Sequence, residues 1–382
     1  MVEVSKDTLD ETTLEVHHPD VCWSVTTIEP DSEWLTAAVM KLVTRDARMK
    51  ELCAPEIAVL QEAGELGKDL TPLTKPCFFP NRCVVWKLQG GGVVCYSVSK
   101  ILDGMREWLD SLGGVRAFFC AHTNNLLQWQ EFWPEAVCLG HQNTKTAAKN
   151  KYRGELRVDW YLPLGDATDG FRVDMTEAPP EVRMNVGTGS AQSKVSLAEG
   201  LQDFDVFAIP LGMRKGFAEH DVYHKPSGTL ASADLVYNGT VAAEGTGIGW
   251  ETQDKARLAW LSMWHKANVQ REGTGHLPAY RHMLTLCGII SHFMCITTTK
   301  CERNVIAACC CLFGGCCPCI CCKAPDWRDQ MKAIDAICEL DLKKIISCHA
   351  KVCPTGADCK IVLQKSWQFA RSARGGCALC PA

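Results

Sequence analysis

Cysteine is the residue type in this chain of 382 residues whose number and spacing most obviously suggest chemistry, since 24 of the residues are cysteine. Pairs with the spacing at which thiolates chelate zinc occur at Cys316-x-x-Cys319, Cys319-x-x-Cys322 and Cys377-x-x-Cys380. Joining Cys316 and Cys319 with Cys377 and Cys380 would give a four-thiolate site. Crowded cysteines also produce such pairs by chance, so metal binding is one of three interpretations of this segment.

The second interpretation is attachment to a membrane surface. Met283–Thr299 and Val305–Cys322 contain no Asp, Glu, Lys or Arg, and their lengths lie near the lower limit of about 17 residues for a membrane span. Their Ser, Thr, His and Gly content argues against spanning, whereas adjacent cysteines beside apolar residues suit palmitoylation. The third interpretation is a loop of no specific function, which we favour over acylation, and acylation over a metal site.

The N-terminal sequence and the overall charge set the expected compartment and partners. The first residues, MVEVSKDTLDETTLEV, are acidic and polar and lack the apolar centre of a secretory signal. We therefore expect a cytoplasmic or organelle-stromal protein with reduced thiols, which reaches a membrane surface only if the Cys-rich segment is acylated. The formal net charge is -4 and no long basic run occurs, so we expect no nucleic-acid partner.

Five side chains outside the Cys-rich segment could bind a metal, namely His122, His220, His224, Asp234 and His349. The alternative is that each makes ordinary hydrogen bonds at the end of a strand. For His224 and Asp234 this alternative is at least as good, since polar residues beside a Pro-Ser-Gly turn often satisfy backbone groups. The adjacent histidines 17 and 18 lie in an acidic segment, and we expect a surface pair there.

Other catalytic signatures are missing from the sequence. Neither a G-x-S-x-G nucleophile elbow nor a G-x-x-x-x-G-K-[ST] phosphate-binding loop occurs. The glycine-rich stretch Gly245–Gly249 does not lie between a clear strand and a clear helix, as a dinucleotide-binding loop would.

A layered α/β framework is expected to position the candidate residues. Apolar runs and helical spacing alternate from residue 82 onward, which predicts strands and helices in βαβα order. Glycines 90 to 92 favour a hairpin turn, and Gly113-Gly114 favours a helix end. The predicted elements are strands Arg82–Leu88, Val93–Val98, Val115–Ala121 and Ala136–Gly140, and helices Lys100–Leu112, Leu126–Phe132 and Thr144–Lys151.

The remainder of the chain is less regular. Residues 164–200 are rich in Gly, Pro, Thr and Ser, which predicts a loop. An amphipathic stretch at Leu35–Leu60, interrupted at Pro55, predicts helix near the N-terminus. The further predicted elements are strands Asp203–Ile209, Glu219–His224, Thr229–Tyr237 and Lys343–Ser347, and helices Gln253–Val269, Asp326–Leu340 and Ala357–Ala370.

The order of these pieces, with their residues, resembles a metallo-β-lactamase-like family known as domain of unknown function 4336. The most specific block runs from His224-Lys225-Pro226-Ser227-Gly228 to Ala233-Asp234-Leu235 and resembles the family pattern H-x-P-S-x-T-L-x-x-x-D-L. The matching parts cover about half of the chain. The other blocks are Pro80–Val85 with the Gly90-Gly91 hairpin, Leu112–Arg116, Phe119–Trp133, Trp133–Ala136 and Lys344–His349.

The resemblance implies a fold and a chemistry. The fold is a metallo-β-lactamase-like four-layer αββα sandwich. Members of the wider superfamily hold two metal ions, commonly zinc, at one edge of the paired sheets and use them to activate water for hydrolysis. Asp234 matches the aspartate that bridges the two metals, and His349 matches the late histidine ligand.

The main metal signature of the superfamily, H-x-H-x-D-H, is largely lost from this sequence. The corresponding loop reads His122-Thr123-Asn124-Asn125 and keeps a single histidine. Asparagine oxygen is a weaker zinc ligand than neutral imidazole. If His122, Asp234 and His349 converge, they form a three-ligand site with one open position, which His224 could supplement. We therefore expect zinc, another divalent metal, or no metal.

Two functions follow as hypotheses. The first is a metal-dependent hydrolase with lost or reduced activity and a degenerate active site. The second is a non-catalytic binding or assembly protein, which could associate with membranes through the Cys-rich segment. The expected organisation is an N-terminal extension at 1–75, a metallo-β-lactamase-like domain at 76–372 with a Cys-rich insertion at about 283–325, and a tail at 373–382.

Overall fold

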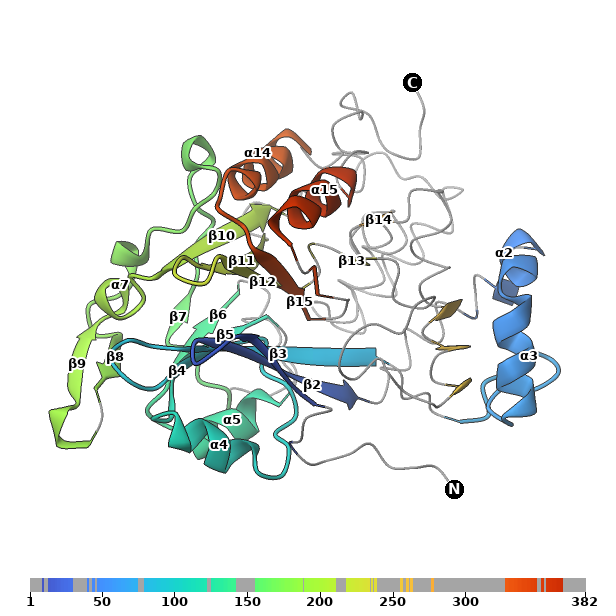
Figure 1. The fold of residues 1–382 in the computed structure, drawn as a ribbon, viewed down its shortest axis with the longest axis horizontal. Coiled ribbons are helices and arrows are strands. Elements are labelled where there is room, and N and C mark those ends of the chain that lie inside the picture. The colour runs from blue at the N-terminus through green and yellow to red at the C-terminus, as the bar shows by residue number, and fades with distance from the viewer. Residues whose placement is uncertain are drawn as a thin grey trace.

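The fold was analysed in a computed structural model, whose main feature is a pair of β-sheets (Figure 1). Within the described residues, one sheet has seven strands and the other has four. The structure describes Leu9 and residues 13–29, 40, 43–44, 47–74, 79–121, 125–141, 155–187, 189–210, 218–233, 235, 237–238, 255–256, 259–260, 262–263, 276–277, 327–348, 352–353 and 355–366.

The seven-stranded sheet is antiparallel at one side and parallel at the other. Strands β1 to β4 are antiparallel neighbours, whereas β4 to β7 run parallel. The C-terminal ends of the parallel strands therefore lie at one edge of the sheet. The strands are β1 (Leu14–His18), β2 (Cys22–Glu29), β3 (Phe79–Lys87), β4 (Val93–Tyr96), β5 (Val115–Cys120), β6 (Val137–Gly140) and β7 (Trp160–Tyr161).

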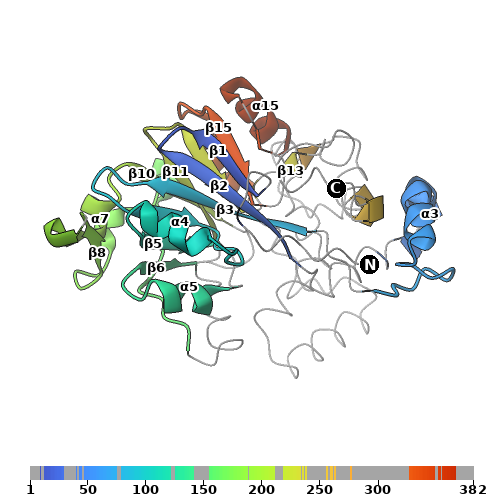
Figure 2. The same cartoon turned by 60° about the horizontal axis from the view of Figure 1, so that its bottom comes forward.

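Both faces of this sheet are buried, which explains the nearly continuous apolar runs of β4, β5 and β6. Along β3, Cys83 and Val85 face one hydrophobic cluster, and Val84 and Trp86 face another. Helices α4 (Met105–Ser111) and α5 (Leu126–Phe132) cover the face of Cys83 and Val85. Figure 2 shows these two helices together on one side of the sheet.

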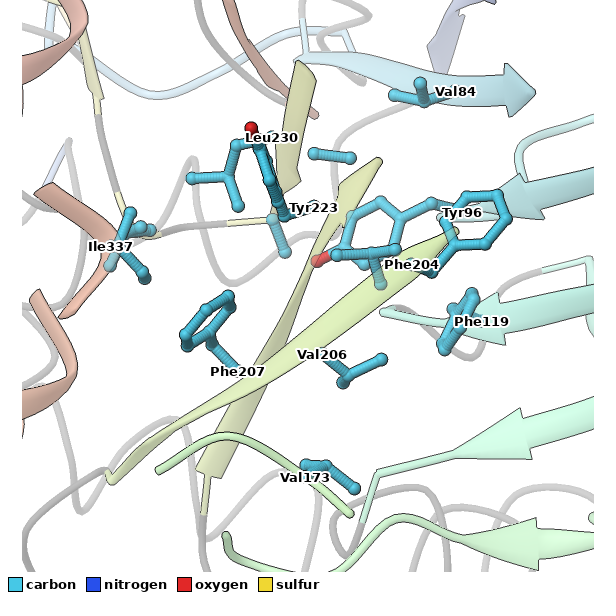
Figure 3. Packing of buried hydrophobic residues seen from close by; sticks show 14 of the residues in the cluster. Val84, Tyr96, Phe119, Val173, Phe204, Val206, Phe207, Tyr223, Leu230 and Ile337 are labelled. Carbon is cyan, nitrogen blue, oxygen red and sulfur yellow. The ribbon is translucent and has the colours of Figure 1, made fainter. Parts of the chain in front are cut away.

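The four-stranded sheet packs against the other face. It contains β10 (Phe204–Pro210), β11 (Ala218–His224), β12 (Thr229–Ser232) and β15 (Lys344–Ser347), and helices α14 (Trp327–Cys338) and α15 (Gly356–Ser366) cover its outer side. Residues of both sheets and both helices share the largest hydrophobic cluster (Figure 3). The layer order is helix, sheet, sheet, helix, so the expected four-layer αββα sandwich is confirmed.

Most predicted elements of the sandwich are present with ends shifted by a few residues, and α5 has the predicted bounds. Gly91 and Gly92 adopt positive φ in the β3–β4 turn, as the sequence indicated. Two predictions were wrong. Residues 164–200 include a hairpin of β8 (Arg183–Val186) and β9 (Ser193–Ser196), and β12 ends at Ser232 instead of Tyr237.

The N-terminal 75 residues contain two kinds of structure. Strands β1 and β2 belong to the seven-stranded sheet, so the sandwich includes part of the segment that we expected to be an extension. Helices α2 (Ala47–Leu52) and α3 (Ala54–Glu62) follow, with Pro55 in the first turn of α3. They form a separate small core with described residues of the predicted helix Gln253–Val269, and Trp260 Nε1 donates to Glu65 Oε2 at 2.6 Å.

Several predicted segments lie outside the described residues. These are the helix at Thr144–Lys151, the Cys-rich insertion at 283–325 and the tail at 373–382. In the part of the chain that the structure describes, no helix combines the length and hydropathy needed to cross a bilayer. The remaining short elements are η1 (Ala167–Asp169), η2 (Met175–Glu177), η3 (Gly189–Ala191), α7 (Leu197–Gly200), β13 (Tyr237–Asn238) and β14 (His276–Leu277).

Candidate functional site

The ends of strands from both sheets meet at one edge of the sandwich. The C-terminal ends of β4, β5 and β6 lie there, because these strands are parallel. The Tyr96 hydroxyl at the end of β4 donates to the carbonyl of His220 in β11 at 3.0 Å, and Arg82 N in β3 donates to Cys348 O after β15 at 3.1 Å. These bonds join the two sheets at what we call the strand-end edge.

Two histidines meet at the strand-end edge. His141 directly follows β6, and His220 lies in the first half of β11. Their Nδ1 atoms are 3.3 Å apart, and the two rings are nearly perpendicular at 84° with centroids separated by 4.8 Å. Both residues are buried. The sheets therefore bring together two imidazoles that are 79 positions apart in the sequence.

The protonation of His220 follows from its surroundings. Its Nε2 lies 2.9 Å from the carbonyl oxygen of Pro163. A carbonyl can only accept a hydrogen bond, so Nε2 carries the proton and Nδ1 of the neutral ring has a lone pair facing His141. Burial lowers the pKa of His220 to about 4, so the ring is neutral at physiological pH. A neutral imidazole with one nitrogen fixed by a carbonyl is in the form that binds a metal.

Two arrangements account for the short distance between Nδ1 of His141 and Nδ1 of His220. In one, Nδ1–H of His141 donates a hydrogen bond to Nδ1 of His220. In the other, both lone pairs point at a cation. Zinc binds imidazole nitrogen at about 2.0–2.1 Å, so two ligands at tetrahedral angles are about 3.4 Å apart. The separation of 3.3 Å between the two Nδ1 atoms matches that value and is equally compatible with the hydrogen bond.

A complete metal site is not found among the described residues. Within them, no group of three or more His, Cys, Asp and Glu side chains could hold a metal ion. Three predicted ligands, His122, Asp234 and His349, lie outside the described residues. Each directly follows in sequence a described residue of the strand-end edge, namely Ala121, Ala233 or Cys348. The predicted thiolate ligands Cys316, Cys319, Cys377 and Cys380 also lie outside the described residues.

The ends of β12 and β15 are joined by hydrogen bonds. Cys348 N donates to Ser232 O at 2.9 Å, and Ser347 Oγ donates to Ala233 O at 3.3 Å. Glu219, next to His220 in β11, accepts a 2.8 Å hydrogen bond from Ala233 N. The residues before positions 234 and 349 are thus held next to each other and near His220.

A buried arginine joins the seven-stranded sheet to the end of β15. Arg82 is fully buried, and its Nη1 donates to Ser347 O at 2.6 Å while Nε donates to Thr26 Oγ1 at 3.1 Å. Burial lowers the pKa of its guanidinium group. Asp221 in β11 is buried as well. Together with Glu219 these residues give the strand-end edge several buried ionisable side chains, whereas the hydrophobic cluster that the two sheets share is apolar.

His224, a predicted ligand, lies at the opposite end of β11. It is four residues from His220, which corresponds to about 14 Å along a strand. Its Nδ1 is 2.8 Å from Ser227 Oγ, which in turn donates to Thr229 Oγ1 at 2.9 Å, and its ring packs on Phe204 at 4.8 Å. These contacts favour the alternative in which His224 satisfies groups around the Pro-Ser-Gly turn.

The expected surface pair of histidines at positions 17 and 18 was half wrong. His18 is exposed, but the side chain of His17 is fully buried. Its Nε2 lies 2.7 Å from Ser24 Oγ, and burial together with the charges of Lys344 and Arg82 lowers its pKa to about 2. Side chains alternate along β1, so neighbouring histidines necessarily face opposite sides.

Sequence reasoning missed His141 as a functional candidate. The available signal was its position directly after the predicted strand Ala136–Gly140, just as His122 directly follows the predicted strand Val115–Ala121 in the sequence. The pairing with His220 could not be found in the sequence, because it depends on how the two sheets are stacked.

Of the comparisons with known proteins, only the one with solved structures gave matches. No protein-family model matches the chain, and no curated protein matches it. Solved structures similar to it include the DIM-1 metallo-β-lactamase (TM-score 0.40, 10% identity, 94% of this chain and 96% of that chain) and a metallo-β-lactamase from Erythrobacter litoralis (TM-score 0.39, 8% identity, 94% and 92%). A mutant of the flavo di-iron protein from Thermotoga maritima is also similar, with a TM-score of 0.41 and 9% identity. That match covers 94% of this chain and 62% of the flavo di-iron protein chain. Identities this low carry no information about activity.

Proposed function

We propose that this chain is a metal-dependent hydrolase with a reduced metal centre at the strand-end edge. His141 and His220 are two of its ligands, and the further ligands come from His122, Asp234 and His349. The observation that supports this most is the 3.3 Å separation of the two Nδ1 atoms, with Nε2 of His220 bonded to the Pro163 carbonyl.

The residues around His220 prepare it for this role. The Pro163 carbonyl holds the proton on Nε2 and leaves Nδ1 free of one, which sets the tautomer that a ligand needs. Burial keeps the ring neutral, because the charged form is poorly solvated there. No proton has to leave His220 before it can bind a cation at neutral pH.

The chemistry of such a centre is hydrolysis. A bound divalent metal lowers the pKa of a water molecule and polarises the oxygen of a scissile bond. The loop that starts at His122 has lost most of H-x-H-x-D-H, so we expect one metal in place of two. One metal with fewer imidazole ligands implies weaker metal binding than a complete set of ligands gives.

A second candidate is a binding or assembly protein without catalysis. The burial of the strand-end edge favours it, because His141, Glu219, His220 and Asp221 are all 4% exposed or less. A substrate that cannot reach the imidazoles cannot be hydrolysed there. The two candidates differ in whether metal-loaded protein turns over a substrate.

Elemental analysis of the full chain, purified without added metal or chelator, tests the proposal. We expect close to one zinc, or another divalent metal, per chain in the wild type and a clear loss in both His141→Gln and Asp234→Ala. His224→Gln is the matched control and should keep the metal. Wild type without metal, or metal that persists in both site variants, would contradict the proposal.

A hydrolysis assay then separates the two candidates. Metal-loaded wild type should hydrolyse at least one chromogenic carboxylic ester, thioester or phosphodiester, and His141→Gln should not. Metal binding without turnover of any of the three bond types would support the binding protein.

A further inference from the structure

The hydroxyl of Tyr96 makes a hydrogen bond between the sheets that ends on the backbone of His220. Tyr96 is the last residue of β4 and is fully buried. Figure 3 shows its side chain extending from the seven-stranded sheet toward the strands of the second sheet. Its Oη donates to the carbonyl of His220 at 3.0 Å. A residue of one sheet thus fixes the backbone that carries an imidazole of the candidate site.

The position of His220 in β11 makes this bond important. The described ladder between β11 and β12 pairs Val222 with Ala231 at one end and His224 with Thr229 at the other. His220 lies beyond the Val222 end of this ladder. On the other side of β11, His220 is opposite Ala208 of β10. Strand β10 is therefore the described ladder partner of this part of β11. The hydrogen bond from Tyr96 attaches it to the seven-stranded sheet as well.

The two contacts of His220 complement each other. Tyr96 fixes its main chain, and the Pro163 carbonyl fixes its ring through Nε2. Nδ1 can then face His141 only in a narrow range of positions. A metal site tolerates little displacement of a ligand, because ligand distances vary by only about 0.2 Å.

We propose that Tyr96 is a positioning residue that sets His220 against His141 for metal binding. The inference rests on the proposed function, since it assigns Tyr96 to the same centre. Tyr96 touches no metal, and it acts through the backbone of His220. Outer residues that orient metal ligands typically change metal affinity about 10–100-fold when they are removed.

The structure offers a closely matched control in Tyr223. This residue also lies on β11, on the strand face opposite to that of His220. Its hydroxyl also donates to a backbone carbonyl, that of Asp341, at 3.1 Å. Asp341 precedes β15, whose C-terminal end lies at the strand-end edge, so this bond is at the other end of the sheet. Tyr96→Phe and Tyr223→Phe each remove one hydroxyl and one hydrogen bond to a carbonyl, and both keep the aromatic ring.

The test compares wild type, Tyr96→Phe and Tyr223→Phe as full chains. Zinc affinity is measured by competition with a chromogenic chelator, and the visible absorption of the cobalt-substituted protein reports the geometry of the ligands. We expect Tyr96→Phe to bind zinc about tenfold more weakly and to shift the cobalt bands. Tyr223→Phe should match the wild type in both measurements.

The outcomes separate this inference from the proposed function. If wild type binds zinc and the two Phe variants bind it equally well with the same cobalt spectrum, Tyr96 has no positioning role and the metal centre stands. If wild type binds neither zinc nor cobalt, the proposed function fails and the inference fails with it. An equal loss of affinity in both variants would also overturn the inference, because it would reflect stability alone.

Discussion

His141 and His220 come from different sheets of the sandwich, yet their Nδ1 atoms lie 3.3 Å apart in a buried setting. Burying two imidazoles side by side is unfavourable unless both are neutral and their nitrogens are satisfied. A hydrogen bond between them satisfies the pair, and so does a shared cation. Measurements of metal binding and stability distinguish these arrangements and test the fold that produces them.

Zinc should stabilise the folded protein through this pair. Starting from chelator-treated protein, zinc at 100 times its dissociation constant should add about 2.7 kcal/mol to the free energy of unfolding. We expect this gain in wild type and in His224→Gln, and its loss in His220→Gln, measured by urea unfolding with and without zinc. A gain of the same size in His220→Gln would mean that zinc binds elsewhere.

Stability should fall as the pH drops below the pKa of an unfolded histidine, because of His17. Its pKa is about 2 in the folded protein, whereas the ordinary pKa of a histidine side chain is 6.5, so the unfolded chain binds the extra proton between these values. Stability is then lost as the pH falls from 6.5, by about 1.4 kcal/mol per pH unit.

The His17 prediction is checked by urea unfolding of metal-free protein at pH 7 and pH 5. His17→Gln cannot take up the proton, so its loss between the two pH values should be smaller than in wild type by about 2 kcal/mol. His18→Gln, at the exposed neighbouring position, should behave as wild type. Identical pH dependence in all three proteins would show that the His17 side chain is accessible to water.

The described cysteines should resist alkylation in the folded protein. Ten of the cysteines in the described part of the chain are free thiols, and all ten are buried. Burial raises the pKa of Cys22 to about 12 and that of Cys120 well above its usual value, so little reactive thiolate is present at these two positions. Iodoacetamide labelling followed by mass spectrometry should modify only cysteines outside these ten until the protein is unfolded.

The same labelling experiment bears on the Cys-rich segment. If it carries acyl groups in cells, as the membrane hypothesis predicts, Cys316 and Cys319 in protein from such cells should label only after hydroxylamine treatment. Rapid labelling of Cys22 or Cys120 in folded protein would contradict the burial of the sandwich core.

Two glycines of positive φ should differ in how well they tolerate alanine. Gly104 has φ of +82°, and a Cβ added there would have no atom within 4 Å. Gly113 has φ of +104°, and a Cβ added there would lie only 2.6 Å from the backbone nitrogen of Gly92. Gly104→Ala should cost about 1–3 kcal/mol for the backbone conformation alone. Gly113→Ala should cost more, because the β3–β4 turn has to move. Equal losses in urea unfolding would contradict this close contact.

The sequence predicted the parts of the fold whose patterns are local. The strands from Phe79 to Gly140, helix α5 and the strands β10, β11 and β15 have continuous apolar runs or helical spacing. The order of these pieces then resembled a family with four layers, and the layers are present.

The elements that were missed have patterns that depend on distant partners. Strands β1 and β2 turn polar side chains inward, including His17, Ser24 and Thr26, so their sequence suggests surface. Those groups are satisfied by residues far along the chain, such as Arg82, which donates to Thr26 Oγ1. The hairpin β8–β9 is mostly exposed and carries no apolar alternation.

The candidate site could be predicted only in part. The sequence identified His220 among possible ligands and the strand ends as the place where ligands gather. It did not identify His141, because no spacing along the chain links this residue to His220. The contact of the two arises from the stacking of two sheets, which the bond from Tyr96 to His220 helps to fix.

X-ray absorption spectroscopy at the zinc edge of zinc-loaded wild-type protein tests the proposed metal centre at the strand-end edge. We expect nitrogen and oxygen neighbours at about 2.0–2.2 Å with at least two imidazoles, and one imidazole fewer in His141→Gln. A shell of four sulfur atoms at about 2.3 Å, unchanged in His141→Gln, would place the metal among the cysteines and contradict a metal centre at His141 and His220.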